Sequence, residues 1–253
     1  MKRLLVGNIQ PNTKWLANDL ITLLKAQIHN SIELGWNRDD LLILVNFDFD
    51  FMDVKPVKIP MNSFCLTGSK MFAIQWLFNN NIDDVVWSAD LDVWQNVPFQ
   101  CPEFNDVGVT EYSRPKINGG SIFWKKQAID IINEVVGTLD KDLARREEPT
   151  LNRVLRKYPD RVTTLNYTYN VGCSGYIPRY TKSIKPVHAF HFHPNNGIAW
   201  ETHVLDRAGL GVRISERLEK LIRIYYPNLA TELSLKGKRR REEKLKEKKN
   251  GKK

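Results

Sequence analysis

The sequence is most informative at residues 83–94, which read Asp-Asp-Val-Val-Trp-Ser-Ala-Asp-Leu-Asp-Val-Trp. The apolar run from Val85 to Trp87 predicts a buried strand, and Asp90 and Asp92 follow shortly after it. In an open α/β sheet, ligands bind beyond the carboxyl ends of the strands. Carboxylate oxygens are ligands that Mg²⁺ and Mn²⁺ prefer. We therefore predict a divalent metal site at Asp90 and Asp92.

The pair also has a simpler interpretation, because aspartate is common in turns. A second Asp-x-Asp sequence, formed by Asp48 and Asp50, has the same spacing. It lies in a phenylalanine-rich stretch, whereas Asp90 and Asp92 follow a strand and precede further predicted strands. We therefore favour Asp90 and Asp92 as the metal ligands.

The segments before this one predict the fold class. Residues 4–7 and 41–45 are short apolar runs typical of buried strands, and a helical pattern that ends at Gly35 lies between them. A second helix is predicted over residues 69–78. This alternation of strands and helices predicts βαβ crossovers and an α/β fold with a mostly parallel, Rossmann-like sheet flanked by helices. Further strands are expected at 107–110, 121–124, 162–165 and 187–192, and further helices at 126–136, 149–157 and 214–226.

Two later segments carry polar residues beside predicted elements. Gly119 and Gly120 precede an apolar strand, where glycine permits close backbone approach to a ligand, although a plain turn is the simpler interpretation. Glu147 and Glu148 precede Pro149, which suits the first position of a helix. The two acids are candidates for catalysis, but acids also stabilise the first turn of a helix without any further role.

Three histidines lie close together near residue 190. In a strand, alternation places His191 and His193 on one face and His188 on the other. One of them is a candidate for a third metal ligand, and packing inside the protein is the alternative.

Taken in order, these segments resemble the GT-A superfamily of nucleotide-sugar-dependent glycosyltransferases, near the glycogenin and galactinol-synthase type. In that type a strand ends in Asp-x-Asp, an Asn-[Ser/Gly]-Gly strand lines the donor sugar, and an acid precedes a helix that begins with Leu-Asn. A His-Phe pair with a downstream Trp supplies a third metal ligand. The matching residues are Asp90 and Asp92, Asn118 to Gly120, Glu147 to Asn152, and His191 with Phe192 and Trp200, within residues 1–205. The chain departs from the family at Glu147-Glu148, where Asp-Gln is usual, and at Ile198-Ala199-Trp200, where Lys-Pro-Trp is usual.

The resemblance implies a site and a reaction. Asp90, Asp92 and His191 would bind Mn²⁺ or Mg²⁺, which would neutralise the leaving diphosphate of a nucleotide sugar, expected to be a UDP-sugar. Glu147 or Glu148 would be the catalytic carboxylate, with the choice between them open. The residues assigned to nucleotide-sugar binding are Asn8, Lys70, Asp90, Arg114, Asn118, Gly119 and Gly120.

The positive charge of the chain is concentrated at one end. Residues 236–253 contain eleven Lys or Arg and three Glu, and so carry +8 of the net charge of +9. We expect a catalytic domain over residues 1–235 and a basic tail, helical or disordered, over 236–253. Concentrated positive charge attracts polyanions such as nucleic acid. A solubilising end is an equally good interpretation of such a tail.

Composition indicates the compartment. No apolar run approaches the roughly 20 residues that a membrane helix needs, and the first residues do not predict a secretory signal. The three cysteines, Cys65, Cys101 and Cys173, are far apart, which favours reduced thiols. We therefore expect no membrane span and a cytoplasmic location, which is the host cytoplasm if a phage encodes the protein.

The resemblance does not specify the acceptor. Short enzymes of this type are encoded by large tailed phages, some of which add glucose or arabinose to 5-hydroxymethylcytosine in their DNA. A basic tail suits a DNA backbone, so we favour duplex DNA as the partner and 5-hydroxymethylcytosine as the acceptor. The alternative acceptors are a glycan, a lipid carrier or a protein. The alternative function is a non-catalytic nucleic-acid-binding module.

Overall fold

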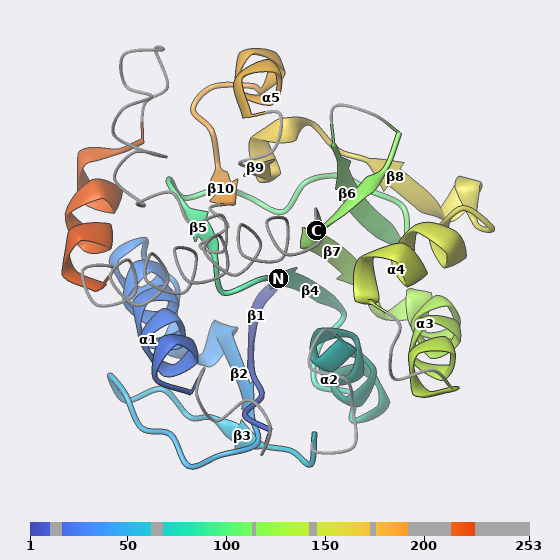
Figure 1. Ribbon diagram of the computed structural model, residues 1–253, viewed down its shortest axis with the longest axis horizontal. Coiled ribbons are helices and arrows are strands. Elements are labelled where there is room, and N and C mark those ends of the chain that lie inside the picture. The colour runs from blue at the N-terminus through green and yellow to red at the C-terminus, as the bar shows by residue number, and fades with distance from the viewer. Residues whose placement is uncertain are drawn as a thin grey trace, which may run out of the picture.

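A seven-stranded sheet forms the centre of the protein, with a three-stranded sheet beside it (Figure 1). The strand orders are β3-β2-β1-β4-β7-β6-β8 and β5-β10-β9. The computed structural model describes residues 1–10, 17–61, 68–112, 115–141, 146–172, 176–191 and 214–225. The residues and segments named above that lie outside this part of the chain are Cys65, Arg114, Cys173, Phe192, His193, residues 198–200 and the basic tail.

One strand of the large sheet runs against its neighbours. Strand β7 is antiparallel to both β4 and β6, whereas the other four pairings in this sheet are parallel. The prediction of a mostly parallel sheet is therefore confirmed. The strands of the large sheet are β1 (Lys2–Gly7), β2 (Leu41–Val45), β3 (Val57–Lys58), β4 (Val85–Ala89), β6 (Val107–Glu111), β7 (Ile117–Lys125) and β8 (Val162–Thr164).

Helices cover both faces of this sheet. Consecutive residues of β1 point to opposite faces, so Leu4 packs into the core under α2, α3 and α4, whereas Leu5 packs against Leu24 and Ile28 of α1. The α-helices are α1 (Ala17–Glu33), α2 (Ser69–Asn79), α3 (Ile129–Lys141), α4 (Glu147–Leu155) and α5 (Tyr176–Lys182). The short 3-10 helices are η2 (Arg38–Asp40), η4 (Lys126–Ala128), η5 (Pro159–Arg161) and η6 (Tyr167–Tyr169).

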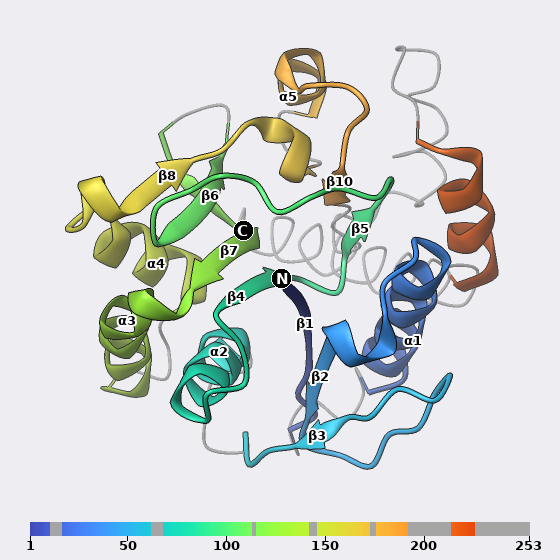
Figure 2. The same ribbon diagram turned by 180° about the vertical axis from the view of Figure 1, so that it is seen from behind.

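The small sheet joins distant parts of the chain. It consists of β5 (Val93–Gln95), β9 (Val171–Gly172) and β10 (Ala189–His191). A helix over residues 216–225 packs against this sheet and against α1, because Leu218 and Ile222 share a core with Ala26, Trp94 and Phe190. Figures 1 and 2 show this helix and α1 side by side from both directions. In the described part of the chain, no helix is long and apolar enough to span a membrane.

Several predicted boundaries need correction. Strand β7 begins at Ile117, so Asn118, Gly119 and Gly120 lie inside the strand and not in a turn before it. Helix α4 begins at Glu147, which makes Pro149 its third residue and not its first. The strand predicted at 187–192 begins later, at Ala189, and its described part ends at His191. No local pattern predicted β3, β5, β9 or α5.

Candidate active site

The two aspartates lie on a tight turn between the two sheets. Strand β4 ends at Ala89, and the N–H of Val93 donates to the carbonyl oxygen of Asp90 at 2.9 Å. The N–H of Asp90 donates to the carbonyl oxygen of Gly120 in β7 at 2.8 Å. The turn is thus fixed to the large sheet on one side and continues into β5 of the small sheet on the other.

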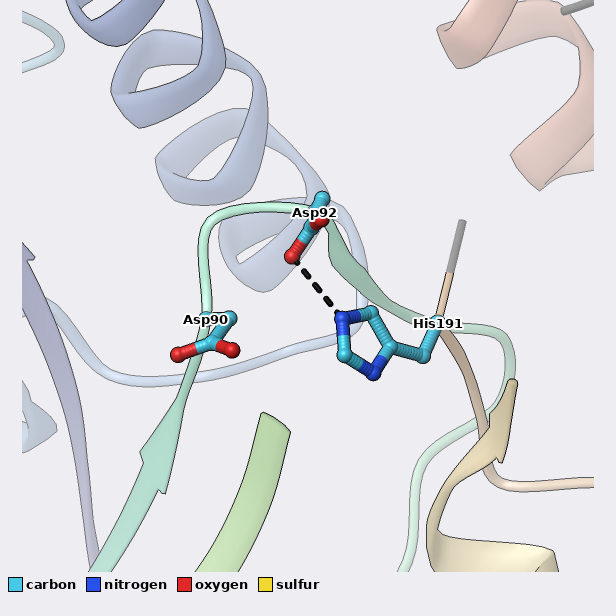
Figure 3. A group of neighbouring side chains, drawn as sticks. All are labelled: Asp90, Asp92 and His191. Carbon is cyan, nitrogen blue, oxygen red and sulfur yellow. Dashed lines mark ion pairs between the residues drawn. The ribbon is translucent and has the colours of Figure 1, made fainter. Parts of the chain in front are cut away.

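The small sheet places His191 beside this turn. His191 is the last residue of β10 and is opposite Val93 in the register of β10 with β5. The ring is 2% exposed, and its Nε2 lies 3.1 Å from Oδ1 of Asp92 (Figure 3). Asp90, Asp92 and His191 offer ligand atoms that all lie within 4.8 Å of one another. The fold therefore brings together the three residues that the sequence assigned to the metal.

The other Asp-x-Asp pair has no comparable surroundings. Asp48 is exposed and forms an ion pair with Lys58 at 2.8 Å. Within the described ranges, Asp90, Asp92 and His191 are the one group of three or more His, Cys, Asp or Glu residues that could bind a metal ion. Asp50 belongs to no such group there.

Gly120 leaves space for the histidine ring. A Cβ atom at this position would lie 2.3 Å from both Nδ1 and Cε1 of His191, closer than any side chain permits. Asn118, which is fully buried, accepts a hydrogen bond from the N–H of Gly120 through Oδ1 at 2.9 Å. At Gly119, by contrast, a Cβ atom would meet Leu151 at an ordinary 3.6 Å.

A cavity of about 510 Å³ opens beside the turn. Most of the predicted site residues line it: Asn8, Lys70, Asp90, Gly119, Gly120, Glu147, Glu148 and His191. Asn118 is buried behind this surface and does not line the cavity. The remaining lining residues are Val6, Leu20, Ser69, Ala89, Leu91, Lys116, Arg146 and Pro149.

Lys70 connects three parts of the cavity wall. Its ammonium group is 2.5 Å from Oδ1 of Asp90, 2.6 Å from the carbonyl oxygen of Gly119 and 3.2 Å from Oε1 of Glu147. Burial lowers the pKa of this lysine, but the two carboxylates outweigh burial, so that the pKa is raised above its ordinary value. Lys70 therefore carries its charge inside the protein.

The two adjacent glutamates have different surroundings. Burial raises the pKa of Glu147 to about 7, with the charge of Asp90 acting in the same direction and Lys70 acting against it. Glu148 accepts hydrogen bonds from the ammonium of Lys116 and, at 2.7 Å, from the hydroxyl of Tyr112. Burial also raises the pKa of Glu148, but these hydrogen bonds outweigh it and the net pKa lies below its usual range. Glu148 is therefore ionised at neutral pH, whereas Glu147 gains or loses its proton near pH 7.

Asn8 also lines the cavity and lies just after β1. Its Nδ2 donates to the hydroxyl of Ser69 at 2.6 Å and to the carbonyl oxygen of Met61 at 3.4 Å. Its buried Oδ1 accepts no hydrogen bond within the part of the chain that the structure describes. Asn8 is thus a cavity-lining residue whose amide oxygen is buried.

Comparison with known proteins relates this architecture to solved enzymes. No protein-family model and no curated protein matches the sequence. The structure of the galactosyltransferase LgtC, in complex with donor and acceptor sugar analogues, superimposes with a TM-score of 0.53 at 14% identity, covering 87% of this chain and 99% of LgtC. An active-site mutant of LgtC gives 0.52 at 12% identity, with the same shares covered. A glycosyltransferase involved in glycosylation of the major capsid of PBCV-1 gives 0.48 at 16% identity, over 76% of this chain and 92% of that one.

The fold is the GT-A type. In this GT-A fold, the cavity lies at the carboxyl ends of β1 and β4, where an open α/β sheet binds its ligands. Two further residues of the site were not predicted: Tyr112, which donates to Glu148, and Gln27, whose amide donates to the Asp90–Val93 turn. Neither residue stands in a local pattern, because each contact joins segments far apart in the sequence.

Proposed function

We propose that the protein is a metal-dependent glycosyltransferase that moves a sugar from a nucleotide-sugar donor, expected to be a UDP-sugar, to an acceptor hydroxyl. The observation that carries this proposal is one cavity lined by Asp90, His191, Lys70 and both glutamates, in a fold of the GT-A type. A binding module would have no need for two adjacent glutamates with opposite pKa shifts at such a cavity.

The three predicted metal ligands fit a divalent ion. Two carboxylates and one imidazole are ligands that Mn²⁺ accepts readily, and Mg²⁺ favours the two carboxylates. Gly120 supports this assignment, because its missing side chain is what permits the imidazole to lie there. When bound, the ion supplies Lewis-acid stabilisation of the leaving diphosphate.

Lys70 and Asn8 are suited to the donor. The ammonium of Lys70 fixes the carboxylate of Asp90 and the carbonyl of Gly119, and it presents a buried positive charge where phosphate oxygens would lie. Asn8 lines the same cavity as Lys70, and we assign it to the binding of the donor. Asn118 acts indirectly, since it lies behind the cavity and bonds to Gly120.

We assign different roles to the two glutamates. A transition state with oxocarbenium character is stabilised by an ionised carboxylate, and Glu148 remains ionised because Lys116 and Tyr112 donate to it. A group that accepts a proton from an acceptor hydroxyl works best with a pKa near the working pH, which Glu147 has.

A donor panel tests the proposed function. The purified protein is incubated with UDP-glucose, UDP-galactose and UDP-arabinose, with Mn²⁺, with Mg²⁺ or with EDTA, and release of UDP is measured. Metal-dependent release from at least one donor is expected. Absence of turnover and of binding for every donor would favour the non-catalytic alternative.

For the acceptor we propose 5-hydroxymethylcytosine in duplex DNA, with residues 1–235 as the catalytic domain and residues 236–253 as the DNA-contacting tail. The support is the charge of +8 in this tail, which suits a polyphosphate backbone. Transfer of radiolabelled sugar to hydroxymethylated DNA, with unmodified DNA of the same sequence as control, tests this. Transfer only to a glycan, a lipid carrier or a protein would replace the DNA proposal. A phage origin and a cytoplasmic location belong to the same proposal.

A further inference from the structure

A side chain outside the Asp90–Val93 turn fixes the orientation of the peptide group between Leu91 and Asp92. The hydrogen bond from Val93 to Asp90 closes a four-residue turn, of which Leu91 and Asp92 are the central residues. In such a turn the central peptide can face either way, and this difference separates the main turn types. Here the carbonyl oxygen of Leu91 accepts a hydrogen bond from Nε2 of Gln27 at 3.0 Å, which selects one orientation.

Arg3 determines which end of the Gln27 amide faces the turn. Nη2 of Arg3 donates to Oε1 of Gln27 at 2.8 Å. A guanidinium group has only donors, so the amide oxygen must face Arg3 and the amide NH₂ is left for Leu91. Both side chains are fully buried, which removes water as a competing partner.

The burial of the Arg3 guanidinium costs folding free energy. Its guanidinium carbon lies 4.7 Å from the centre of the Trp87 ring, and Nη1 donates to the hydroxyl of Ser31 at 2.6 Å. None of the ion pairs within the described ranges includes Arg3, so a buried cation is compensated only by neutral groups. Burying a charge without an opposite charge beside it costs free energy. Stability therefore gives no reason for an arginine here, whereas orienting Gln27 does.

We infer that Arg3 and Gln27 are positioning residues, which orient the Leu91–Asp92 peptide and so direct the Asp92 carboxylate toward His191. The inference rests on the proposed function, since it concerns the metal site of that proposal. Neither residue lines the cavity, and their side chains donate to Ser31, Gln95, Gln27 and Leu91 and not to the three predicted ligands.

The substitution Gln27→Glu separates positioning from packing. Glutamate has nearly the same shape and can pair with Arg3, but its ionised carboxylate has no N–H to donate to Leu91. We expect the thermal midpoint without metal to stay near the wild-type value, because the new ion pair offsets the missing hydrogen bond. The dissociation constant for Mn²⁺, titrated by electron paramagnetic resonance with and without UDP, should rise about 10-fold or more.

Asn30→Asp is the matched control. Asn30 is fully buried on the same helix, and its Nδ2 donates to a main-chain carbonyl oxygen, that of Gln95, at 3.1 Å. This substitution also replaces an amide by a carboxylate. The hydrogen bond that it removes ends at Gln95 in β5, outside the Asp90–Val93 turn. Mn²⁺ affinity should therefore remain near the wild-type value.

A second variant, Arg3→Met, keeps Gln27 but frees its amide to turn over. Arg3→Met should weaken Mn²⁺ binding by a smaller factor than Gln27→Glu. If Gln27→Glu does not fold, the Mn²⁺ affinity of Arg3→Met tests the positioning role by itself. Wild-type Mn²⁺ affinity in both variants, or equal weakening in Gln27→Glu and Asn30→Asp, would overturn the inference alone. A wild-type protein that binds no Mn²⁺, with or without UDP, would overturn the proposed function and the inference together.

Discussion

Gly120 and His191 approach each other so closely that a Cβ atom at position 120 would lie 2.3 Å from Nδ1 of the imidazole ring. The two residues belong to different sheets, Gly120 to β7 and His191 to β10. The absence of one side chain in the large sheet thus fixes where a predicted metal ligand of the small sheet can lie.

We expect Gly120→Ala to displace the imidazole ring and to weaken Mn²⁺ binding by roughly 10-fold to 100-fold, the range seen when supporting groups of metal ligands are altered. Gly119→Ala is the control, because a Cβ atom there would make ordinary contacts with Leu151, Glu147 and Glu148, at 3.6, 3.7 and 3.8 Å. Mn²⁺ titration of the two variants measures the difference. Equal affinities would mean that His191 is not a ligand.

The substitution Asp92→Asn should remove metal-dependent sugar transfer while the fold remains intact, because asparagine has nearly the same shape. Loss of a Lewis acid that contributes several kcal/mol corresponds to a rate at least about 100-fold lower. Asp48→Asn serves as the comparison, since Asp48 is exposed and pairs with Lys58. If the Asp48 variant lost activity and the Asp92 variant kept it, the site would have to be reassigned.

Replacement of Glu148 by Gln should lower kcat by roughly 100-fold to 1,000-fold, the usual effect of removing one electrostatic stabiliser of a transition state. KM for the donor should change little. Glu134→Gln is a close match, because Glu134 also accepts hydrogen bonds from a lysine and a tyrosine, Lys157 and Tyr158, but does not line the cavity. Steady-state kinetics of both variants tests the assignment, which a fully active Glu148→Gln enzyme would contradict.

Glu147 should make the protein less stable as pH rises toward neutrality. The pKa of Glu147 is about 7 in the folded protein, against an ordinary value of 4.5. Between these two pH values the folded protein therefore binds more protons at this residue than the unfolded protein does. The contribution is favourable below pH 4.5 and is lost as pH rises through 7. Glu147→Gln should remove this slope in urea unfolding experiments without metal. Glu134→Gln should not, because the pKa of Glu134 lies below its usual range.

Deletion of residues 236–253 should weaken binding to duplex DNA and flatten its salt dependence. Each DNA phosphate that the tail neutralises adds about −0.9 to the slope of log K against log salt, and the deletion removes that contribution. Donor hydrolysis should stay unchanged, because Asp90, Asp92 and His191 remain. Fluorescence anisotropy at several salt concentrations provides the measurement, and unaltered DNA affinity would leave the tail without a role in DNA binding.

Local sequence patterns were sufficient to predict elements whose structure depends on one short segment. The apolar run at 41–45 predicted strand β2 with its observed bounds, and the Asp-x-Asp sequence was expected at the end of the strand that became β4. Pattern failed at Asn118 to Gly120, which looked like a turn because two glycines are adjacent. Long-range pairing of Ile117 and Asn118 with β6, and the hydrogen bond from Asp90 to Gly120, hold these residues in the strand, and no local signal reports those contacts.

The sequence by itself determined the fold class, the order of the main elements and the types of residue available for chemistry, because hydrophobic periodicity and carboxylate spacing are local properties. Only the tertiary structure decided which of these residues meet. It placed Glu148 between Lys116 and Tyr112, Glu147 beside Lys70, and Gln27 against the turn that carries Asp92. The physical reason is that pKa values and side-chain orientation depend on burial and on neighbours supplied by distant segments.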